Sequence, residues 1–97
     1  MIQSFRDAAT ADLFNGRPSS AARRCCPIAL WPVVRRKLDQ LNNAVSLSSL
    51  RVPPGNRLEA LRGDRAGQFS IRVNQQYRVC FNWTEQGPRD VEVTDYH

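Results

Sequence analysis

The feature that most limits how this chain can fold is an alternation of apolar and polar residues in its second half. Apolar residues occupy every second position over residues 69–73 and again over residues 77–83. A period of two is typical of a β-strand that buries one face, and the polar residues 74–76 between the runs are typical of a turn. The sequence therefore predicts an antiparallel hairpin over residues 69–83.

Shorter strand signals flank this hairpin. Residues 57–61 can form one short strand, and Gly87-Pro88 marks a second turn before a last strand that contains Val91 and Val93. Residues 2–5 also alternate and can form a short first strand.

The first half of the chain has the period of a helix. Five apolar residues follow one another at spacings of four, four, three and four, which places them on one helix face. Because proline is tolerated in the first turn, regular helix is expected to begin near Pro32. Asp7 and Gly16 are typical of the two caps of a shorter helix over residues 8–14. The five spaced residues are Leu30, Val34, Leu38, Leu41 and Val45.

Short elements are expected between these helices and the strands. Residues 17–29 show no clear period and are predicted to be mainly loop, while Ser46 can cap one further helical turn. Residues 53–56, Pro-Pro-Gly-Asn, predict a loop, because the prolines remove backbone donors. With 97 residues, the chain has room for one domain over residues 1–97, and we expect an α+β fold with helices on one face of a twisted antiparallel sheet.

The charge of the chain favours a polyanionic partner. Fourteen basic residues against nine acidic ones give a net charge of +5, and all the basic residues except Lys37 are arginine. Residues 13–78 hold twelve basic and three acidic residues, a local charge of +9. Arginine binds phosphate through two parallel hydrogen bonds, so RNA and DNA are natural partners. A basic surface with no specific ligand, or an acidic protein partner, is equally consistent with charge alone.

Several site types find no support in the sequence. Cys25 and Cys26 are adjacent, Cys80 stands alone, and His97 is the sole histidine, so neither a disulfide framework nor a metal site is expected. No apolar run approaches the roughly 18 residues of a membrane span, and the N-terminus lacks an apolar signal segment. These features predict a soluble, cytoplasmic protein without a membrane partner.

The alternation also predicts which residues share the second face of the sheet. If the helices cover the face of Phe69 and Ile71, the opposite face presents Arg72 and Arg78. We expect this face to lie near the basic segment 57–65 and the C-terminal Asp95-Tyr96-His97.

Three segments of the chain carry a family resemblance. They are residues 53–74, which contain Arg57-Leu-Glu-Ala-Leu-Arg-Gly-Asp-Arg, then Tyr77-Arg-Val-Cys-Phe-Asn-Trp, and finally Val91-Glu-Val-Thr-Asp-Tyr-His. Together they resemble the HigB-type toxins of the RelE/ParE superfamily, and the likeness extends over nearly the whole chain. Glu59 stands where several members have a histidine.

The resemblance implies a fold, an activity and partners. The fold is two N-terminal helices packed on one face of the sheet. The activity is that of a bacterial type II toxin that enters the ribosomal A site and cleaves messenger RNA without a metal or other cofactor. The partner is a HigA-type antitoxin with a helix-turn-helix domain, through which the pair binds operator DNA. Two alternatives stay open: a catalytically silent toxin of this fold that poisons gyrase, and a basic nucleic-acid-binding module.

Metal-independent RNA cleavage requires a base, cations and an acid, and the chain offers candidates for each. His97 is the candidate acid, because its ordinary pKa lies near neutrality, and Asp95 or Glu59 can act as base or orient His97. Tyr96 and Tyr77 can stack on a displaced base, although core packing is the simpler interpretation of Tyr77. The candidate phosphate-binding arginines are Arg62 and Arg78, which we expect to take part in catalysis, and Arg57, Arg65 and Arg72, which we expect to bind RNA.

Overall fold

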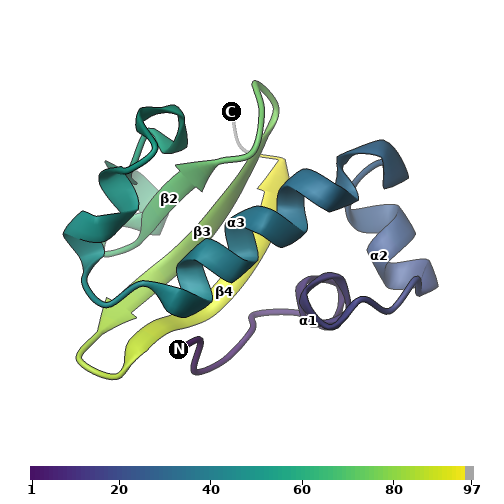
Figure 1. Ribbon diagram of the computed structural model, residues 1–97, viewed down its shortest axis with the longest axis horizontal. Helices are drawn as coiled ribbons and strands as arrows, with labels where there is room; N and C mark the ends of the chain where they lie inside the picture. Colours follow the sequence, from purple (N-terminus) through teal and green to yellow (C-terminus); the bar gives the residue numbers. More distant parts are fainter. Residues whose placement is uncertain (96–97) are drawn as a thin grey trace.

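The computed structural model describes residues 1–95, in which helices pack against one face of a four-stranded antiparallel sheet (Figure 1). The strands are β1 (Glu59–Ala60), β2 (Phe69–Arg72), β3 (Tyr77–Thr84) and β4 (Gly87–Asp95), and they lie in chain order. The expected α+β fold with helices on one side is confirmed.

The predicted hairpin is the centre of this sheet. Phe69 pairs with Phe81 and Ile71 pairs with Val79, so the apolar positions of β2 and β3 share one face. Val79 pairs in turn with Val93 of β4. Ile71, Val79 and Phe81 are fully buried against the helices, as their alternation requires.

Helix α3 (Trp31–Asn43) supplies the other half of the core. Its Val34, Leu38 and Leu41 are fully buried on the sheet, and proline occupies its first turn. Val45, predicted on the same face, is 92 % exposed, because the helix ends at Asn43 and the chain turns to extended backbone at Ala44. The prediction for Val45 is therefore wrong.

The helix near the N-terminus is confirmed with both of its caps. In α1 (Ala8–Asn15), the Asp7 carboxylate accepts a hydrogen bond from the Thr10 amide at 2.8 Å. Gly16 ends the helix with a φ of 73°, a conformation that favours glycine.

The expectation of mainly loop over residues 17–29 is wrong. A further helix, α2 (Ser20–Cys25), is capped by Ser19, and a 3-10 turn, η1 (Ile28–Leu30), leads into α3. Ala22 is the buried residue that α2 contributes to the core, so this helix carries no apolar period that the sequence could display.

Two 3-10 turns connect α3 to the sheet, and a third lies between β1 and β2. The turn predicted after Ser46 is confirmed as η2 (Leu47–Arg51), and residues 53–56 contain η3 (Pro54–Asn56). The strand expected over residues 57–61 is confirmed as the short β1, which is followed by η4 (Gly63–Arg65).

The N-terminal segment lies along the outer edge of β4. The expected strand over residues 2–5 is reduced to one parallel bridge between Phe5 and Val91, flanked by a hydrogen bond from the Arg6 amide to the Val91 carbonyl at 2.9 Å. Asp90, with a φ of 52°, interrupts the regular backbone of β4 beside this bridge, so a longer ladder does not form. None of the helices in residues 1–95 is both long enough and apolar enough to cross a membrane.

Candidate active site

Opposite the helices, the sheet presents a charged surface that we call the arginine face. The register places Ser70, Cys80 and Glu92 in one cross-strand row. It places Arg72, Arg78 and Thr94 in the next row. Because paired residues share a face, these six side chains lie on the side away from the apolar core. The predicted juxtaposition of Arg72 and Arg78 is present.

Arg78 is the most confined of these cations. Its Nη2 donates a hydrogen bond to the Arg57 carbonyl at 3.0 Å, and its Nη1 lies 3.7 Å from Glu59 Oε1. The side chain is 16 % exposed, and its Nε has no hydrogen-bond partner among the residues described. Arg57 has a φ of 46°, so a left-handed turn after η3 presents its carbonyl to Arg78.

Asn56 fixes this left-handed turn from the protein interior. The buried Asn56 amide donates to Gln40 Oε1 and to the Leu50 carbonyl, both at 3.1 Å. Its Oδ1 accepts from Lys37 Nζ at 2.5 Å. Residues of α3 and η2 therefore hold the residue that immediately precedes Arg57.

Arg72 lies directly opposite Arg78 in the β2–β3 ladder. Two like charges in this arrangement repel one another, which disfavours the ligand-free protein. A phosphate bound between them removes that repulsion, so the pair is suited to an anionic ligand.

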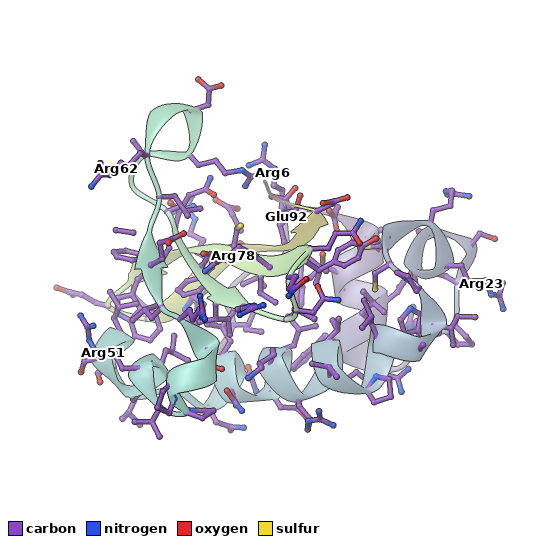
Figure 2. The ribbon with its side chains drawn as sticks, turned by 90° about the horizontal axis from the view of Figure 1, so that it is seen from above. Arg6, Arg23, Arg51, Arg62, Arg78 and Glu92 are labelled. Carbon is purple, nitrogen blue, oxygen red and sulfur yellow. The ribbon has the colours of Figure 1, made fainter. Side chains whose placement is uncertain are left out.

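An ion-pair cluster covers the other row of the arginine face. Glu92 Oε1 accepts a hydrogen bond from Arg65 Nη1 at 2.9 Å, and Glu92 Oε2 lies 3.9 Å from Arg6 Nε. Figure 2 shows Arg6 next to Glu92, with Arg78 farther along the sheet. The alternation of the last strand predicts Glu92 on the side away from Val91 and Val93, and the register confirms this position. Neither Glu92 nor Arg6 was predicted as a site residue, and nothing in the sequence places Arg6 here.

Arg62 does not join the other arginines. It precedes η4, and Figure 2 shows its side chain pointing away from the sheet. With Glu59, Ala60 and Leu61 it lines a pocket of about 310 Å³ beside the edge strand β1. Its predicted catalytic role stays a prediction.

The predicted C-terminal residues fall partly outside the described chain. Asp95 ends β4 opposite Tyr77, which places its side chain on the helix side of the sheet, and Gln76 Nε2 donates to its carboxylate at 2.9 Å. The expectation that Asp95 shares the surface of Arg72 and Arg78 is therefore wrong, because its position in the alternation of β4 turns it to the other face. Tyr96 and His97 lie outside the described residues, so their predicted roles stay predictions. Tyr77 is half-buried against the core, consistent with packing.

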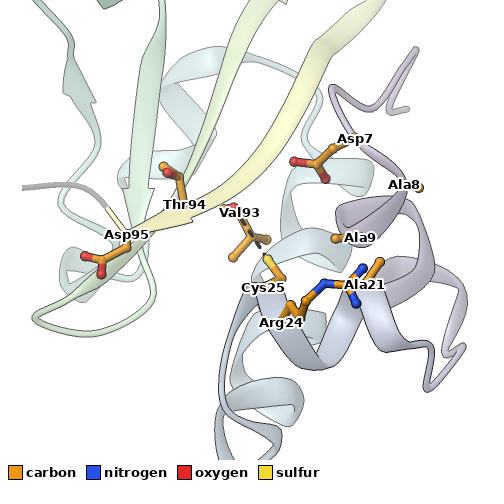
Figure 3. A pocket seen from close by; sticks show the side chains of 9 residues that line it. All are labelled: Asp7, Ala8, Ala9, Ala21, Arg24, Cys25, Val93, Thr94 and Asp95. Atoms are coloured by element: carbon orange, nitrogen blue, oxygen red, sulfur yellow. Dashed lines mark hydrogen bonds between the residues drawn. The ribbon is translucent and has the colours of Figure 1, made fainter.

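The helix side of the sheet carries a second pocket, of about 460 Å³, at the C-terminal end of β4. Figure 3 shows it between β4 and the helices α1 and α2. Cys25 lines it and donates to the Val93 carbonyl at 3.6 Å. Burial raises the pKa of this thiol to about 12, so it stays protonated at neutral pH. Within residues 1–95, no group of three or more histidine, cysteine or acidic residues is arranged to hold a metal ion.

Comparison with known proteins agrees with this architecture. A family model described as "RelE-like toxin of type II toxin-antitoxin system HigB" matches residues 3–97. The chain is 47 % identical over 62 residues to Toxin HigB-1 of Vibrio cholerae, covering 64 % of this chain and 65 % of that protein. It is 40 % identical over 57 residues to an uncharacterized protein of Haemophilus influenzae, covering 59 % of this chain and 56 % of that one. The matches thus span less than two thirds of either relative's length. Because the family model spans almost every residue, the chain belongs to the HigB-like family of RelE-like toxins from type II toxin–antitoxin systems.

Proposed function

We propose that this toxin is a ribosome-dependent endoribonuclease that cleaves messenger RNA in the ribosomal A site without a metal ion. The observation that supports the proposal most strongly is the arginine face, where Arg65, Arg72 and Arg78 are held by the sheet and by hydrogen bonds. Guanidinium groups match phosphate oxygens in geometry and charge, and a message in the A site is single-stranded and offers its backbone.

The proposed reaction joins the 2′-oxygen of one nucleotide to the adjacent phosphorus and breaks the bond to the 5′-oxygen of the next. The products are a 2′,3′-cyclic phosphate and a 5′-hydroxyl. Glu59 accepts the proton of the 2′-hydroxyl, because its half-exposed carboxylate lies beside Arg78 on the arginine face. Arg78 stabilises the charge that develops on the phosphorus oxygens.

The C-terminal residues complete the proposed mechanism. His97 donates a proton to the leaving 5′-oxygen. Asp95, whose carboxylate lies on the helix side of β4, takes no part in this step. Tyr96 stacks on a base next to the cleaved linkage. Arg57 and Arg72 bind neighbouring phosphates, and Arg62, at the edge of the sheet, contacts RNA beyond the cleaved linkage.

We also propose a protein partner. Membership of a type II toxin family supports a HigA-type antitoxin with a helix-turn-helix domain, which neutralises the toxin and carries the pair to operator DNA. The substrate and this partner place the toxin in the bacterial cytoplasm.

The test is cleavage of a translated message, read by primer extension. We expect Arg78→Ala and His97→Ala to lower the cleavage rate on programmed ribosomes by about 100-fold, the loss typical of removing one group that stabilises a transition state. Arg23→Ala, which removes a charge from α2, is the matched control and is expected to cleave at the wild-type rate.

Two results would contradict the nuclease proposal. Intact messages together with gyrase-linked DNA breaks would favour a gyrase-poisoning toxin. Salt-sensitive RNA binding without toxicity would favour a basic binding module.

A further inference from the structure

We propose that Arg6 and Glu92 extend the arginine face into a second phosphate subsite, in which Arg6 binds an RNA backbone phosphate and Glu92 positions Arg6 and Arg65. This inference rests on the proposed function and adds two residues to it. Its starting point is the ion-pair cluster formed by the N-terminal segment, β4 and η4.

Backbone hydrogen bonds between the N-terminal segment and β4 hold Arg6 beside the arginine face. The Arg6 amide donates to the Val91 carbonyl at 2.9 Å, and the Val91 amide donates to the Ser4 carbonyl at 3.1 Å. Phe5, bridged to the buried Val91, packs against Phe14 of α1 in a tilted arrangement with ring centroids 5.5 Å apart. Arg6 follows Phe5 at a bend of the chain, and its Nε lies 3.9 Å from Glu92 Oε2.

Glu92 divides its carboxylate between two guanidinium groups. Its side chain is 17 % exposed, and that of Arg65, which also donates to Gln68, is 25 % exposed. Arg6 is 56 % exposed and lies farther from the carboxylate, at 3.9 Å. The carboxylate therefore anchors a confined Arg65 and an Arg6 whose guanidinium remains accessible to a ligand.

The charge balance of the cluster favours an anion. Two arginines against one carboxylate leave a net charge of +1, which the single charge of a phosphodiester neutralises. Glu92 pairs with Cys80 of β3, and Arg78 lies in the next cross-strand row of the same face, opposite Thr94. The proposed subsite is therefore adjacent to Arg78 on one continuous surface, as successive phosphates of one strand require.

The test compares Arg6→Gln with Arg23→Gln in the full-length chain. Both variants remove one positive charge, but Arg23 lies on α2, away from Arg6, Glu92 and Arg78 (Figure 2). Binding is measured with a short single-stranded RNA carrying 2′-O-methyl groups, which cannot be cleaved, at several salt concentrations. We expect Arg6→Gln to weaken binding about 5- to 10-fold and to reduce the slope of log K against log salt by about 0.7, while Arg23→Gln leaves both nearly unchanged. Arg6→Lys should retain the slope.

The Glu92→Gln variant distinguishes a role of Glu92 in positioning Arg6 and Arg65 from an effect of its negative charge on RNA binding. Removing a negative charge should leave RNA binding equal or stronger, whereas loss of the anchor should lower the cleavage rate on programmed ribosomes at saturating toxin about tenfold. Melting temperatures confirm that each variant folds, and Glu92→Asp, which keeps the charge, should recover part of the rate.

The inference is overturned if Arg6→Gln matches Arg23→Gln in affinity and salt slope, or if folded Glu92→Gln cleaves at the wild-type rate. These outcomes differ from failure of the proposed function, which would appear as a wild-type protein that leaves messages on ribosomes intact.

Discussion

The two faces of the sheet carry opposite kinds of side chain: one face is apolar and buried, and the other is positively charged. The helix side buries Ile71, Val79 and Phe81 under the helices in one apolar core. The arginine face gathers guanidinium groups that repel one another and holds them with single carboxylates and a backbone carbonyl. Burial on one face stabilises the fold, so the other face can carry an arrangement that is favourable only when an anion binds.

The largest expected effect tests the helix side. Leu38→Ala should lower the free energy of unfolding by about 3 kcal/mol, because it removes a fully buried side chain between α3 and the sheet and leaves a cavity. Urea denaturation measures the change. RNA affinity of the folded fraction should be unaltered, and an altered affinity would show that the two faces are not independent.

Asn56→Ala should affect both the stability of the fold and the geometry of the arginine face. Loss of the buried amide leaves the Leu50 carbonyl and the Lys37 ammonium without their partner, which should lower the free energy of unfolding by about 2 kcal/mol. The turn at Arg57 should loosen with it, so the cleavage rate should also fall at temperatures where the variant is fully folded. Circular dichroism melts and single-turnover cleavage measure the two effects, and an unchanged cleavage rate would argue against the link from Asn56 to Arg78.

The smallest expected effect compares thiols on the two sides. Burial raises the pKa of Cys25 from 9.0 to about 12, so folding favours the neutral thiol, and this contribution is present below pH 9 and is lost as the pH rises toward 12. Burial also raises the pKa of Cys80; Glu92 adds to that rise, whereas Arg65, Arg78 and Arg6 oppose it. Because removing Cys25 removes its contribution, the stability of Cys25→Ala should decline less steeply between pH 8 and pH 10.5 than that of the wild-type chain, as measured by urea midpoints. Equal slopes would contradict this assignment.

The elements that the sequence predicted well are those with a strong period. The β2–β3 hairpin and α3 follow from alternating residues and from apolar residues three and four apart, because their core contacts repeat along the chain. Helix α2 was missed because it buries Ala22 and has no apolar stripe. Val45 was misplaced because periodicity alone does not show where a helix ends.

The arginine face was predictable in part for the same reason. Arg72 and Arg78 follow from the alternation of their strands, whereas Arg6 reaches this face through a bridge between residues remote in sequence. Arg62 lies within the same basic segment as Arg65, yet the turn at η4 directs it away from the sheet. The positions of Arg6 and Arg62 depend on tertiary structure, which a local sequence pattern does not show.

The bridge from Phe5 to Val91 has a consequence for the timing of assembly during synthesis. Arg6 is made well before Glu92, so a growing chain without β4 has no Glu92 carboxylate to hold Arg6. The arrangement of Arg6 on the arginine face can therefore form only after β4 has been made.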